Sequence, residues 1–215
     1  MINLILASNS PRRRELISLF GWPFTVLPAD IDESRKADES PIDYVRRLAC
    51  EKAQAIAARE TGLVIAADTI VADGNELLGK PVDEDDARRM LVQLRGRTHQ
   101  VYTGIAVINT ETGESVDDVC RTDVPMRQYS DEEIEQYIAT RDPMDKAGAY
   151  AIQHPGFHPV EGLAGCYASV MGLPLCHLMV GLRKLGFQPV ADLPARCQAW
   201  LAYDCPVFSS ILGAS

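Results

Sequence analysis

Near the start of the chain, the pattern of apolar and polar residues changes from an uninterrupted apolar run to helical spacing. Residues 4–7 read LILA and are apolar without interruption; three small polar residues and a proline then precede a charged segment with helical spacing. This pattern predicts a strand, a tight loop and a helix. Ser10 is a strong helix N-cap residue, and Pro11 suits the first helical position because the backbone N–H that it lacks would have no partner there.

A long helix and a buried strand are predicted next. Residues 41–59 carry an apolar stripe at helical spacing, and Ser40 precedes the stripe as its cap. Residues 63–71 read LVIAADTIV, an apolar run typical of a strand covered on both faces. Asp68 interrupts that run, where an ionised carboxylate is costly unless it is paired or bound to a metal. We therefore predict a functional role for Asp68, with an aspartate that caps a turn as the structural alternative.

The remaining segments predict further strands and helices joined by turns rich in glycine and proline. Two β-rich runs with Gly113 between them predict an antiparallel hairpin, and Ser130 with Glu133 forms a capping-box pattern at the start of a helix. In the tail, a short helix that carries Trp200 is expected to dock on the body or on a second subunit, because its apolar surface is large. The expected strands cover residues 24–27, 98–108, 115–126, 149–152 and part of 160–170, and the other expected helices cover residues 83–93 and 175–185.

Composition and charge narrow the class of protein. With 215 residues the chain fits one sizeable domain or two small ones, and its net charge of −9 argues against binding to nucleic acid polymers or to an anionic membrane. No apolar run approaches the roughly 20 residues of a membrane-spanning helix, and no export signal is expected. The six cysteines show no CxxC spacing, so we expect reduced thiols and a cytoplasmic location.

The first loop and helix together predict an anion-binding pocket. A helix that begins there directs unpaired backbone N–H groups, and the positive end of its dipole, towards the carboxyl end of the preceding strand, where open α/β sheets bind ligands. Arg12, Arg13 and Arg14 add guanidinium groups that suit phosphate. Arginines are also common on the first turn of surface helices, so this stretch alone leaves phosphate binding and a solvated surface as equal alternatives.

Other candidate residues lie in loops and on the second helix. The loop 28–41 is dense in carboxylates, and one of them near a sheet end could help to hold a hard divalent cation; a solvated loop is the alternative. Gly79 and Pro81 limit the freedom of the loop that presents Lys80. Lys52 lies on the polar flank of its predicted helix, and spacing alone gives it no special role.

Short segments spread along the chain carry a family resemblance. They are SNSPRRREL from Ser8, EKA from Glu51, AADTIV from Ala66, GKP from Gly79, GRTHQVYTG from Gly96, DKAGAYAIQ from Asp145 and VMGLP from Val170. In this order they make the chain resemble the Maf family of nucleoside triphosphate pyrophosphatases. The resemblance implies an α/β fold with an elongated mixed β-sheet flanked by helices, and two lobes with a central cleft, as in the inosine triphosphate pyrophosphatases. We expect this domain to span residues 1–187, and residues 188–215 to form a tail with a short docking helix or partial disorder.

The resemblance also implies an activity and the residues that carry it. Members hydrolyse a nucleoside triphosphate between its α and β phosphates with a divalent cation, which is magnesium, manganese or cobalt. By similarity, Asp68 is the general base for the attacking water, and Glu33 and Asp68 are the expected metal ligands. Lys52 and Lys80 are the other expected catalytic residues, since cationic groups neutralise charge on the leaving pyrophosphate. The residues expected to surround the substrate further include Ser8, Arg12 and Arg13.

A few positions imply the choice of substrate within the family. Members that act on dTTP and UTP have SPRR, ADT and a glutamine in AIQ, which Arg12, Arg13, Thr69 and Gln153 match. A neutral amide also suits the edge of uracil or thymine, which offers carbonyl acceptors and one N–H. The alternatives are 7-methyl-GTP or another modified purine as substrate, and a nucleotide-binding regulator of cell division without turnover. The family implies a homodimer. The chain departs from the family pattern at Asn9, Gly165 and Cys166.

Overall fold

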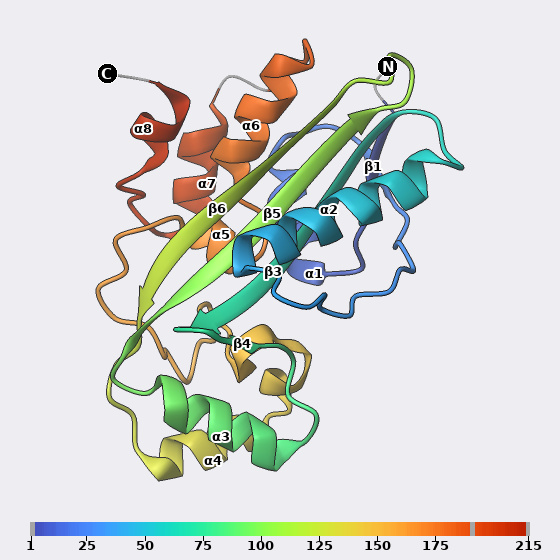
Figure 1. Cartoon of the computed structure of the whole chain (residues 1–215). Coiled ribbons are helices and arrows are strands. Elements are labelled where there is room, and N and C mark those ends of the chain that lie inside the picture. Colours follow the sequence, from blue (N-terminus) through green and yellow to red (C-terminus); the bar gives the residue numbers. More distant parts are fainter. Residues whose placement is uncertain (1–2, 190–191, 214–215) are drawn as a thin grey trace.

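The computed structural model describes residues 3–189 and 192–213. A mixed sheet runs through the molecule, and helices cover both of its faces (Figure 1). The strands are β1 (Leu4–Leu6), β2 (Phe24–Val26), β3 (Leu63–Asp73), β4 (Glu76–Leu78), β5 (Thr98–Asn109) and β6 (Ser115–Pro125). The helices are α1 (Pro11–Ser18), α2 (Pro41–Ala57), α3 (Glu84–Leu94), α4 (Asp131–Ala139), α5 (Tyr167–Val170), α6 (Leu175–Lys184), α7 (Leu193–Leu201) and α8 (Phe208–Leu212), with short 3-10 helices η1 (Asp142–Asp145) and η2 (Ala147–Ala149).

The strand order of the sheet is β2-β1-β3-β5-β6, and β4 pairs with β3 outside this path. β1 lies parallel to β2 and β3, whereas β5 pairs antiparallel with both β3 and β6. The mixed α/β sheet expected from the sequence is therefore confirmed. The long strands β3, β5 and β6 form its elongated centre, and their register places Thr69 beside Thr103 and Thr103 beside Cys120.

Helix α2 covers one face of the sheet. Its small inward residues Ala49 and Ala53 belong to an apolar cluster with Ala66 of β3. Gly104 of β5 carries no side chain towards α2, and a Cβ at this position would lie 2.4 Å from the carbonyl oxygen of Val45. The glycine therefore allows α2 to approach the sheet closely, which brings the polar flank of α2 within reach of β3.

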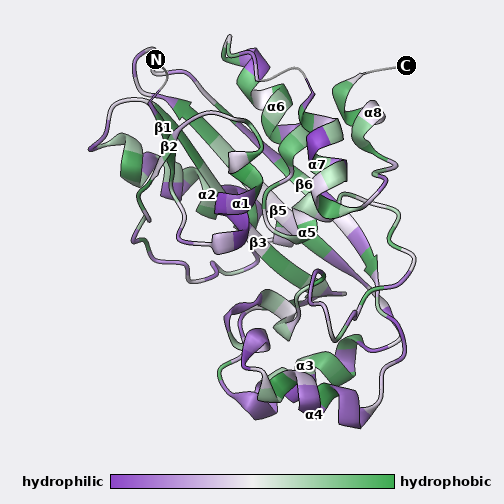
Figure 2. Cartoon of the chain, turned by 180° about the vertical axis from the view of Figure 1, so that it is seen from behind, coloured by the Kyte–Doolittle hydropathy of each residue, from purple (hydrophilic) through white to green (hydrophobic). Residues whose placement is uncertain are grey.

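Helices α1, α5, α6 and α7 lie on the opposite face, where a larger apolar cluster is buried. Leu16 and Ile17 of α1 join it from one end, and Leu178 and Leu182 of α6 join it from the other. In Figure 2 the first turns of α1 stand out as hydrophilic against the green strands behind them. The arginines predicted from the sequence thus project from a helix whose later residues are anchored in the core.

A smaller group of elements, α3, α4, η1 and η2, lies beyond the far end of the sheet (Figure 1). Leu91 of α3 and Ile134 of α4 belong to the same apolar cluster as the helices on the sheet. The two groups of elements both contribute walls to the pocket described below. This arrangement agrees with the two lobes and the central cleft that the resemblance implied.

The helix starts are those that the cap residues predicted. Ser10 accepts a hydrogen bond from the backbone N of Arg13, and Pro11 is the first residue of α1. Ser40 caps α2 in the same way, with Pro41 next to it. Each cap satisfies one of the backbone N–H groups that a helix start leaves without a partner.

The expected strand at residues 149–152 is wrong. Gly148 and Ala149 have φ angles of 69° and 59°, so the chain turns at the point where a strand would have to begin. The backbone N–H of Ala151 donates to the hydroxyl of Tyr137 at 2.9 Å, and a side chain thereby replaces the strand neighbour. Ile152 is buried without a sheet, which shows that its apolar character reflected burial and not a strand.

The expected strand within residues 160–170 is also wrong. Val160 makes only an isolated bridge to Met126, and the segment ends in helix α5. Cys166 starts this helix because its sulfur accepts a hydrogen bond from the backbone N of Ser169 at 3.4 Å. Cysteine is not one of the usual N-cap residues, so the sequence carried no ordinary signal for this helix.

Helix α7 contains the short helix expected in the tail. Leu193 and Cys197 of α7 are buried in the larger apolar cluster. After α7, the hydroxyl of Tyr203 donates to the carbonyl oxygen of Gly165 at 2.9 Å, and this contact ties the end of the chain to the segment before α5. Among the described residues, none of the helices has both the length and the apolar character that crossing a membrane needs.

Candidate active site

The pocket lies where β3 has a neighbouring strand on one side only. β1 follows β3 as far as Ile65, whose carbonyl accepts a hydrogen bond from the backbone N of Ala7 at 2.8 Å. β4 joins the same edge of β3 from Val71 onwards, and β5 pairs along the whole opposite edge. Residues 66–70 therefore have one open edge, and the loop after β1 faces the loop after β4 across the opening.

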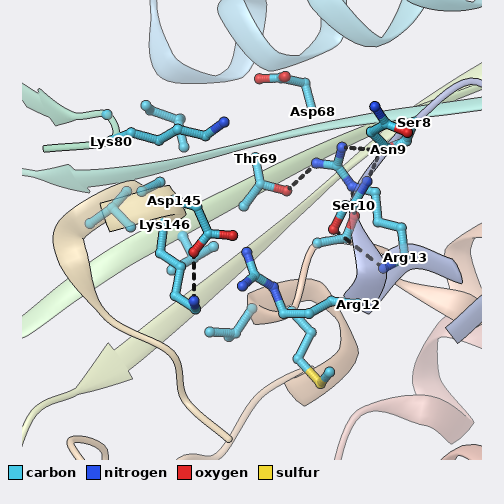
Figure 3. Close-up of a pocket in the computed structure, with 18 of the residues that line it drawn as sticks. Ser8, Asn9, Ser10, Arg12, Arg13, Asp68, Thr69, Lys80, Asp145 and Lys146 are labelled. Carbon is cyan, nitrogen blue, oxygen red and sulfur yellow. Dashed lines mark hydrogen bonds and ion pairs between the residues drawn. The ribbon is translucent and has the colours of Figure 1, made fainter. Parts of the chain in front are cut away.

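A cavity of about 620 Å³ occupies this opening, a size typical of sites for small molecules. Its walls come from the β1–α1 loop, the open part of β3, the loop after β4, and the segment 145–153 (Figure 3). The residues to which the resemblance assigned a role all line it, whereas Arg14, which the sequence analysis placed beside Arg12 and Arg13 in the anion pocket, is exposed and lies outside the cavity lining. The lining residues with an assigned role are Ser8, Arg12, Arg13, Glu33, Lys52, Asp68, Thr69, Lys80 and Gln153.

Arg13 is held in place by three separate segments. Its Nη1 donates to Ser8 Oγ at 3.1 Å, its Nε donates to the carbonyl oxygen of Gly172 at 2.8 Å, and its Nη2 donates to Thr69 Oγ1 at 3.2 Å (Figure 3). These bonds use the fork geometry of the guanidinium to fix its orientation. Arg13 therefore presents its charge at the pocket in a defined position before any ligand arrives.

Thr103 extends this network behind the pocket. Its hydroxyl lies 2.9 Å from Thr69 Oγ1 and donates to the carbonyl oxygen of Ser169 at 2.8 Å. Because that proton points to Ser169, the hydroxyl proton of Thr69 is the one shared between the two threonines, and a lone pair of Thr69 is left to accept from Arg13. Thr103 was missed by the sequence analysis, since a threonine in a β-rich run is typical of any strand.

Lys52 joins two carboxylates on the α2 side of the pocket. Its Nζ lies 2.6 Å from Asp68 Oδ1 and 2.7 Å from Glu33 Oε1. The side chains of Lys52 and Asp68 are only 10% and 11% exposed, whereas that of Glu33 is 57% exposed. Burial raises the pKa of Asp68, although the ammonium of Lys52 and the guanidinium of Arg13 oppose that rise. A carboxylate with a raised pKa at the wall of a cavity is suited to accept a proton.

Besides Arg13, whose three hydrogen-bond partners are neutral, two cations of the pocket have no anionic partner within the described part of the chain. Arg12 and Lys80 enter the same space from different sides (Figure 3). Lys146 also lines the cavity, but its Nζ is already bound by Asp142 Oδ1 at 2.8 Å and by Asp145 Oδ1 at 2.6 Å. The sequence analysis missed Lys146 as a wall residue; the acids one and four positions before it are the signal that its charge is paired. Arg12, Lys80 and the oriented Arg13 are thus the charges open to an anion.

Gln153 and Tyr150 line the pocket from the segment after η2. The side chain of Gln153 is exposed and forms no hydrogen bond to another described residue, so both its amide donor and its carbonyl acceptor are available. Tyr150 is buried, and its hydroxyl lies 2.8 Å from Nε2 of the buried His99. Burial lowers the pKa of His99 to about 4, so this histidine is neutral at physiological pH.

The family model described as Maf-like protein matches residues 3–185 of the chain. The chain belongs to the Maf-like protein family. The dTTP/UTP pyrophosphatase of Geotalea uraniireducens is 48% identical over 185 residues, which are 86% of this chain and 95% of that protein. The dTTP/UTP pyrophosphatase of Dictyoglomus thermophilum is 45% identical over 186 residues, which are 86% of this chain and 96% of that protein.

The comparison with solved structures finds the Ham1 protein of Staphylococcus aureus. It is 14% identical, with a TM-score of 0.43, and the alignment covers 93% of this Maf-like chain and 98% of the other. All of the assigned side chains of this Maf-like protein lie within residues 3–185, the part that the family model matches, and α7 and α8 lie outside it.

Asp68 and Glu33 are the carboxylates of this Maf-like protein that could hold a divalent cation. Asp68 and Glu33 both contact the ammonium of Lys52, so a cation at this place would have two carboxylates within reach. Magnesium is commonly held by one or two carboxylates together with waters and substrate phosphates. The described residues contain no group of three or more His, Cys, Asp or Glu arranged for a metal. The pair therefore fits a cation that arrives with phosphate oxygens, and it does not form a complete protein cage.

Proposed function

We propose that this protein is a nucleoside triphosphate pyrophosphatase that hydrolyses dTTP, UTP and related or modified pyrimidine nucleotides to the monophosphate and pyrophosphate. The observation that carries the proposal is the setting of Asp68. This buried carboxylate lies on an open strand edge and shares one cavity with the unpaired cations Arg12 and Lys80 and with the fixed guanidinium of Arg13. The names of the relatives support the choice of pyrimidine triphosphates as substrates.

In the proposed reaction, Asp68 accepts a proton from a water that attacks the α-phosphorus of the nucleotide. The bond between that phosphorus and the oxygen bridging to the β-phosphate breaks, and pyrophosphate leaves. Lys52, 2.6 Å from Asp68 Oδ1, keeps the carboxylate oriented and ionised before the proton transfer. The raised pKa of Asp68 brings it closer to the operating pH, and this makes it a better base than an exposed aspartate.

The cations of the pocket stabilise the charge that develops on the leaving pyrophosphate. Arg13 is oriented by its three hydrogen bonds, and the start of α1 adds backbone N–H groups from the same loop. Donors that are already in place need little reorganisation during the reaction. A divalent cation held by Asp68 and Glu33 would supply further neutralisation of the phosphate oxygens. Gln153 would read the base, because an amide matches the acceptors and the N–H of a uracil or thymine edge.

The test is the release of pyrophosphate from dTTP, UTP, dCTP, ITP and 7-methyl-GTP by the wild type and by Asp68→Asn. We expect dTTP and UTP to be the best substrates, and Asp68→Asn to lower kcat about 10²- to 10⁴-fold. Asp73→Asn is the matched control, since it changes an aspartate of the same strand outside the cavity. An Asp68→Asn rate within a few fold of the wild type would refute the proposed base.

The same panel separates the alternatives. Faster hydrolysis of 7-methyl-GTP would favour a purine-directed enzyme, and tight nucleotide binding without release of pyrophosphate would favour a regulator of cell division. We further propose magnesium as the cation, a homodimer, and a cytoplasmic location. The free state of all six cysteines supports a reducing compartment, the dimer rests on the family resemblance, and light scattering of the purified protein measures its mass.

A further inference from the structure

Tyr137 of α4 contacts the chain on both sides of Gln153. Its hydroxyl accepts a hydrogen bond from the backbone N of Ala151 at 2.9 Å, two residues before Gln153. Its ring lies against the imidazole of His154, the residue after Gln153, with the ring centroids 4.7 Å apart and the planes at 62°. Aromatic pairs favour such edge-to-face contacts. One side chain behind the cavity wall therefore fixes the backbone of the residue proposed to read the base.

Further hydrogen bonds hold the hydroxyl of Tyr137 in place. It donates to Asp142 Oδ2 at 2.7 Å, and Asp142 Oδ1 accepts from Nζ of Lys146 at 2.8 Å. The same Nζ donates to the carbonyl oxygen of Asp142 at 2.6 Å and to Asp145 Oδ1 at 2.6 Å. All three N–H donors of the Lys146 ammonium are thus bound within the protein. This cation of the cavity lining therefore stabilises the wall that Tyr137 holds.

A second tyrosine has the same surroundings but a different partner. Tyr137 stacks on Phe157, with the centroids 4.3 Å apart and the planes at 14°, and Tyr129 packs on the same ring at 4.9 Å. Both tyrosines are buried. The hydroxyl of Tyr129, however, donates to the carbonyl oxygen of Leu91 in α3, whereas that of Tyr137 bonds to a residue that lines the cavity. Tyr129 is consequently a matched control for Tyr137.

The segment 145–153 is also joined to the loop that presents Lys80. The backbone N of Gly148 donates to the carbonyl oxygen of Gly79 at 3.0 Å. Between this bond and the one from Ala151, Ala149 has a φ angle of 59°, a left-handed conformation that a residue other than glycine keeps only where its surroundings enforce it. The two hydrogen bonds therefore set the separation between the base-reading wall and the phosphate-binding loop, and the segment should shift when one of them is lost.

This separation matters because hydrogen bonds alone do not distinguish all purines from pyrimidines. The edge of uracil offers a carbonyl oxygen beside an N–H, and the hypoxanthine of ITP offers the same pair on its six-membered ring. The amide of Gln153 matches both. The larger purine places that edge further from the sugar. Discrimination against ITP must therefore come from the position of the amide and not from its chemistry.

We propose that Tyr137 is a positioning residue that sets the preference for pyrimidine over purine nucleotides, by holding Gln153 at a fixed distance from the phosphate-binding loop. This inference rests on the proposed function and identifies what determines the substrate class of that site. In Tyr137→Phe the ring and its stacking remain, while the N–H of Ala151 loses its partner. The segment that carries Gln153 is then free to move outwards and admit a larger base, because a binding group is only as well placed as the residues that support it.

The test measures kcat/KM for UTP and for ITP, by release of pyrophosphate, in the wild type, Tyr137→Phe and Tyr129→Phe. We expect Tyr137→Phe to lower the ratio of UTP to ITP about three- to tenfold, as for the loss of one hydrogen bond. Tyr129→Phe should keep the ratio of the wild type. A mere loss of stability would leave the ratio unchanged, because a smaller folded fraction lowers both rates by the same factor.

His154→Asn provides a second variant that acts from the other side of Gln153. Nδ1 of His154 accepts from the backbone N of Gly156 at 3.2 Å and of Phe157 at 3.0 Å, and asparagine side chains accept such local backbone bonds. The variant removes the ring that contacts Tyr137 and should lower the ratio in the same direction. It keeps the proposal testable if Tyr137→Phe does not fold.

Amide hydrogen exchange gives a measurement that does not depend on activity. In Tyr137→Phe a peptide covering residues 148–154 should exchange faster than in the wild type, and in Tyr129→Phe it should not. An unchanged ratio of UTP to ITP in Tyr137→Phe, or in His154→Asn if the first variant does not fold, would overturn the proposal, as would an equal fall in Tyr129→Phe. A wild type that hydrolyses ITP as well as UTP would overturn it too and leave the pyrophosphatase activity established. Release of pyrophosphate from no nucleotide would refute the proposed function and with it the role in specificity, whereas faster exchange in Tyr137→Phe would still show that Tyr137 fixes this wall.

Discussion

Removal of the Lys52 ammonium tests how the pocket keeps a carboxylate buried. In Lys52→Met the aliphatic stem is retained, while Asp68 and Glu33 lose the cation that lies within 2.7 Å of both. The Glu33 contact contributes little, about 0–1 kcal/mol, because that carboxylate is exposed. Asp68 is buried, and leaving a buried charge without its partner costs about 3–5 kcal/mol. We therefore expect most of the lost stability to come from Asp68.

The stability lost in Lys52→Met should increase as the pH rises. Burial already raises the pKa of Asp68 above its ordinary value of 3.8, and removing the ammonium raises it further. The folded state then binds more protons than the unfolded state, so the free energy of unfolding falls as pH rises from about 4 through the folded pKa. One proton limits this slope to about 1.4 kcal/mol per pH unit. Lys52→Met should consequently be close to the wild type near pH 4 and most destabilised near pH 8.

The assay is urea unfolding at pH 5 and pH 8, with the free energy of unfolding extrapolated to water. Lys36→Met is the control, since Lys36 forms an exposed ion pair of 3.7 Å with Glu51 and should change stability by less than about 1 kcal/mol. In an Asp68→Asn background the pH dependence caused by Lys52→Met should disappear. Equal losses at both pH values, or the same loss in that background, would refute the account of a carboxylate stabilised by Lys52.

The other predictions concern the activity of the pocket and, for Thr103, also the stability of the fold. Thr103→Val removes the acceptor of the Thr69 hydroxyl and leaves the Ser169 carbonyl with only its hydrogen bond from the backbone N of Gly172. The variant should cost about 1–3 kcal/mol of stability in urea unfolding, with a several-fold rise in KM and a smaller change in kcat. The acid limb of kcat/KM against pH should show an apparent pKa above 3.8, and the residual activity of Asp68→Asn should lack that limb; an unchanged limb contradicts the base assignment. Gln153→Glu should lower kcat/KM for UTP and dTTP, measured by pyrophosphate release, because a carboxylate cannot donate to their carbonyl oxygens. Chelation of divalent cations should abolish turnover and added magnesium should restore it; full activity in excess chelator contradicts the proposed cation.

The β1–α1 region could be predicted from the sequence because its signals are local. Ser10 and Pro11 define a helix start within two residues, and no distant contact is needed to recognise it. Asp68 was found for a related reason: an acid within an apolar strand is costly wherever the strand lies. The position of Lys52 is different, because only the folding of α2 over β3 brings it to Asp68. Spacing along the helix could not reveal that contact, and only the family resemblance indicated it.

The errors have a common physical cause. The apolar residues 149–152 and 160–170 have the composition of strands, but composition does not tell whether a strand edge is available for pairing. At Ala151 the hydroxyl of Tyr137 takes the place of that edge. Thr103 and Lys146 were missed because their roles arise from contacts with other segments, with Ser169 for the first and with paired acids for the second. The sequence therefore predicts best those site residues that can be recognised within their own segment, either from the geometry of a helix start or from the free-energy cost of a charge in an apolar strand.

The open edge of β3 explains how one pocket uses both faces of the sheet. Successive residues of a strand point to opposite faces, so Asp68 reaches Lys52 on the α2 side while its neighbour Thr69 reaches Arg13 and Thr103 on the α5 side. Thr103→Val should therefore disturb Arg13, the arginine proposed to bind phosphate, and leave the Asp68–Lys52 pair intact. In kinetic terms, Thr103→Val should raise KM without moving the acid limb of the pH profile, whereas Lys52→Met should move that limb.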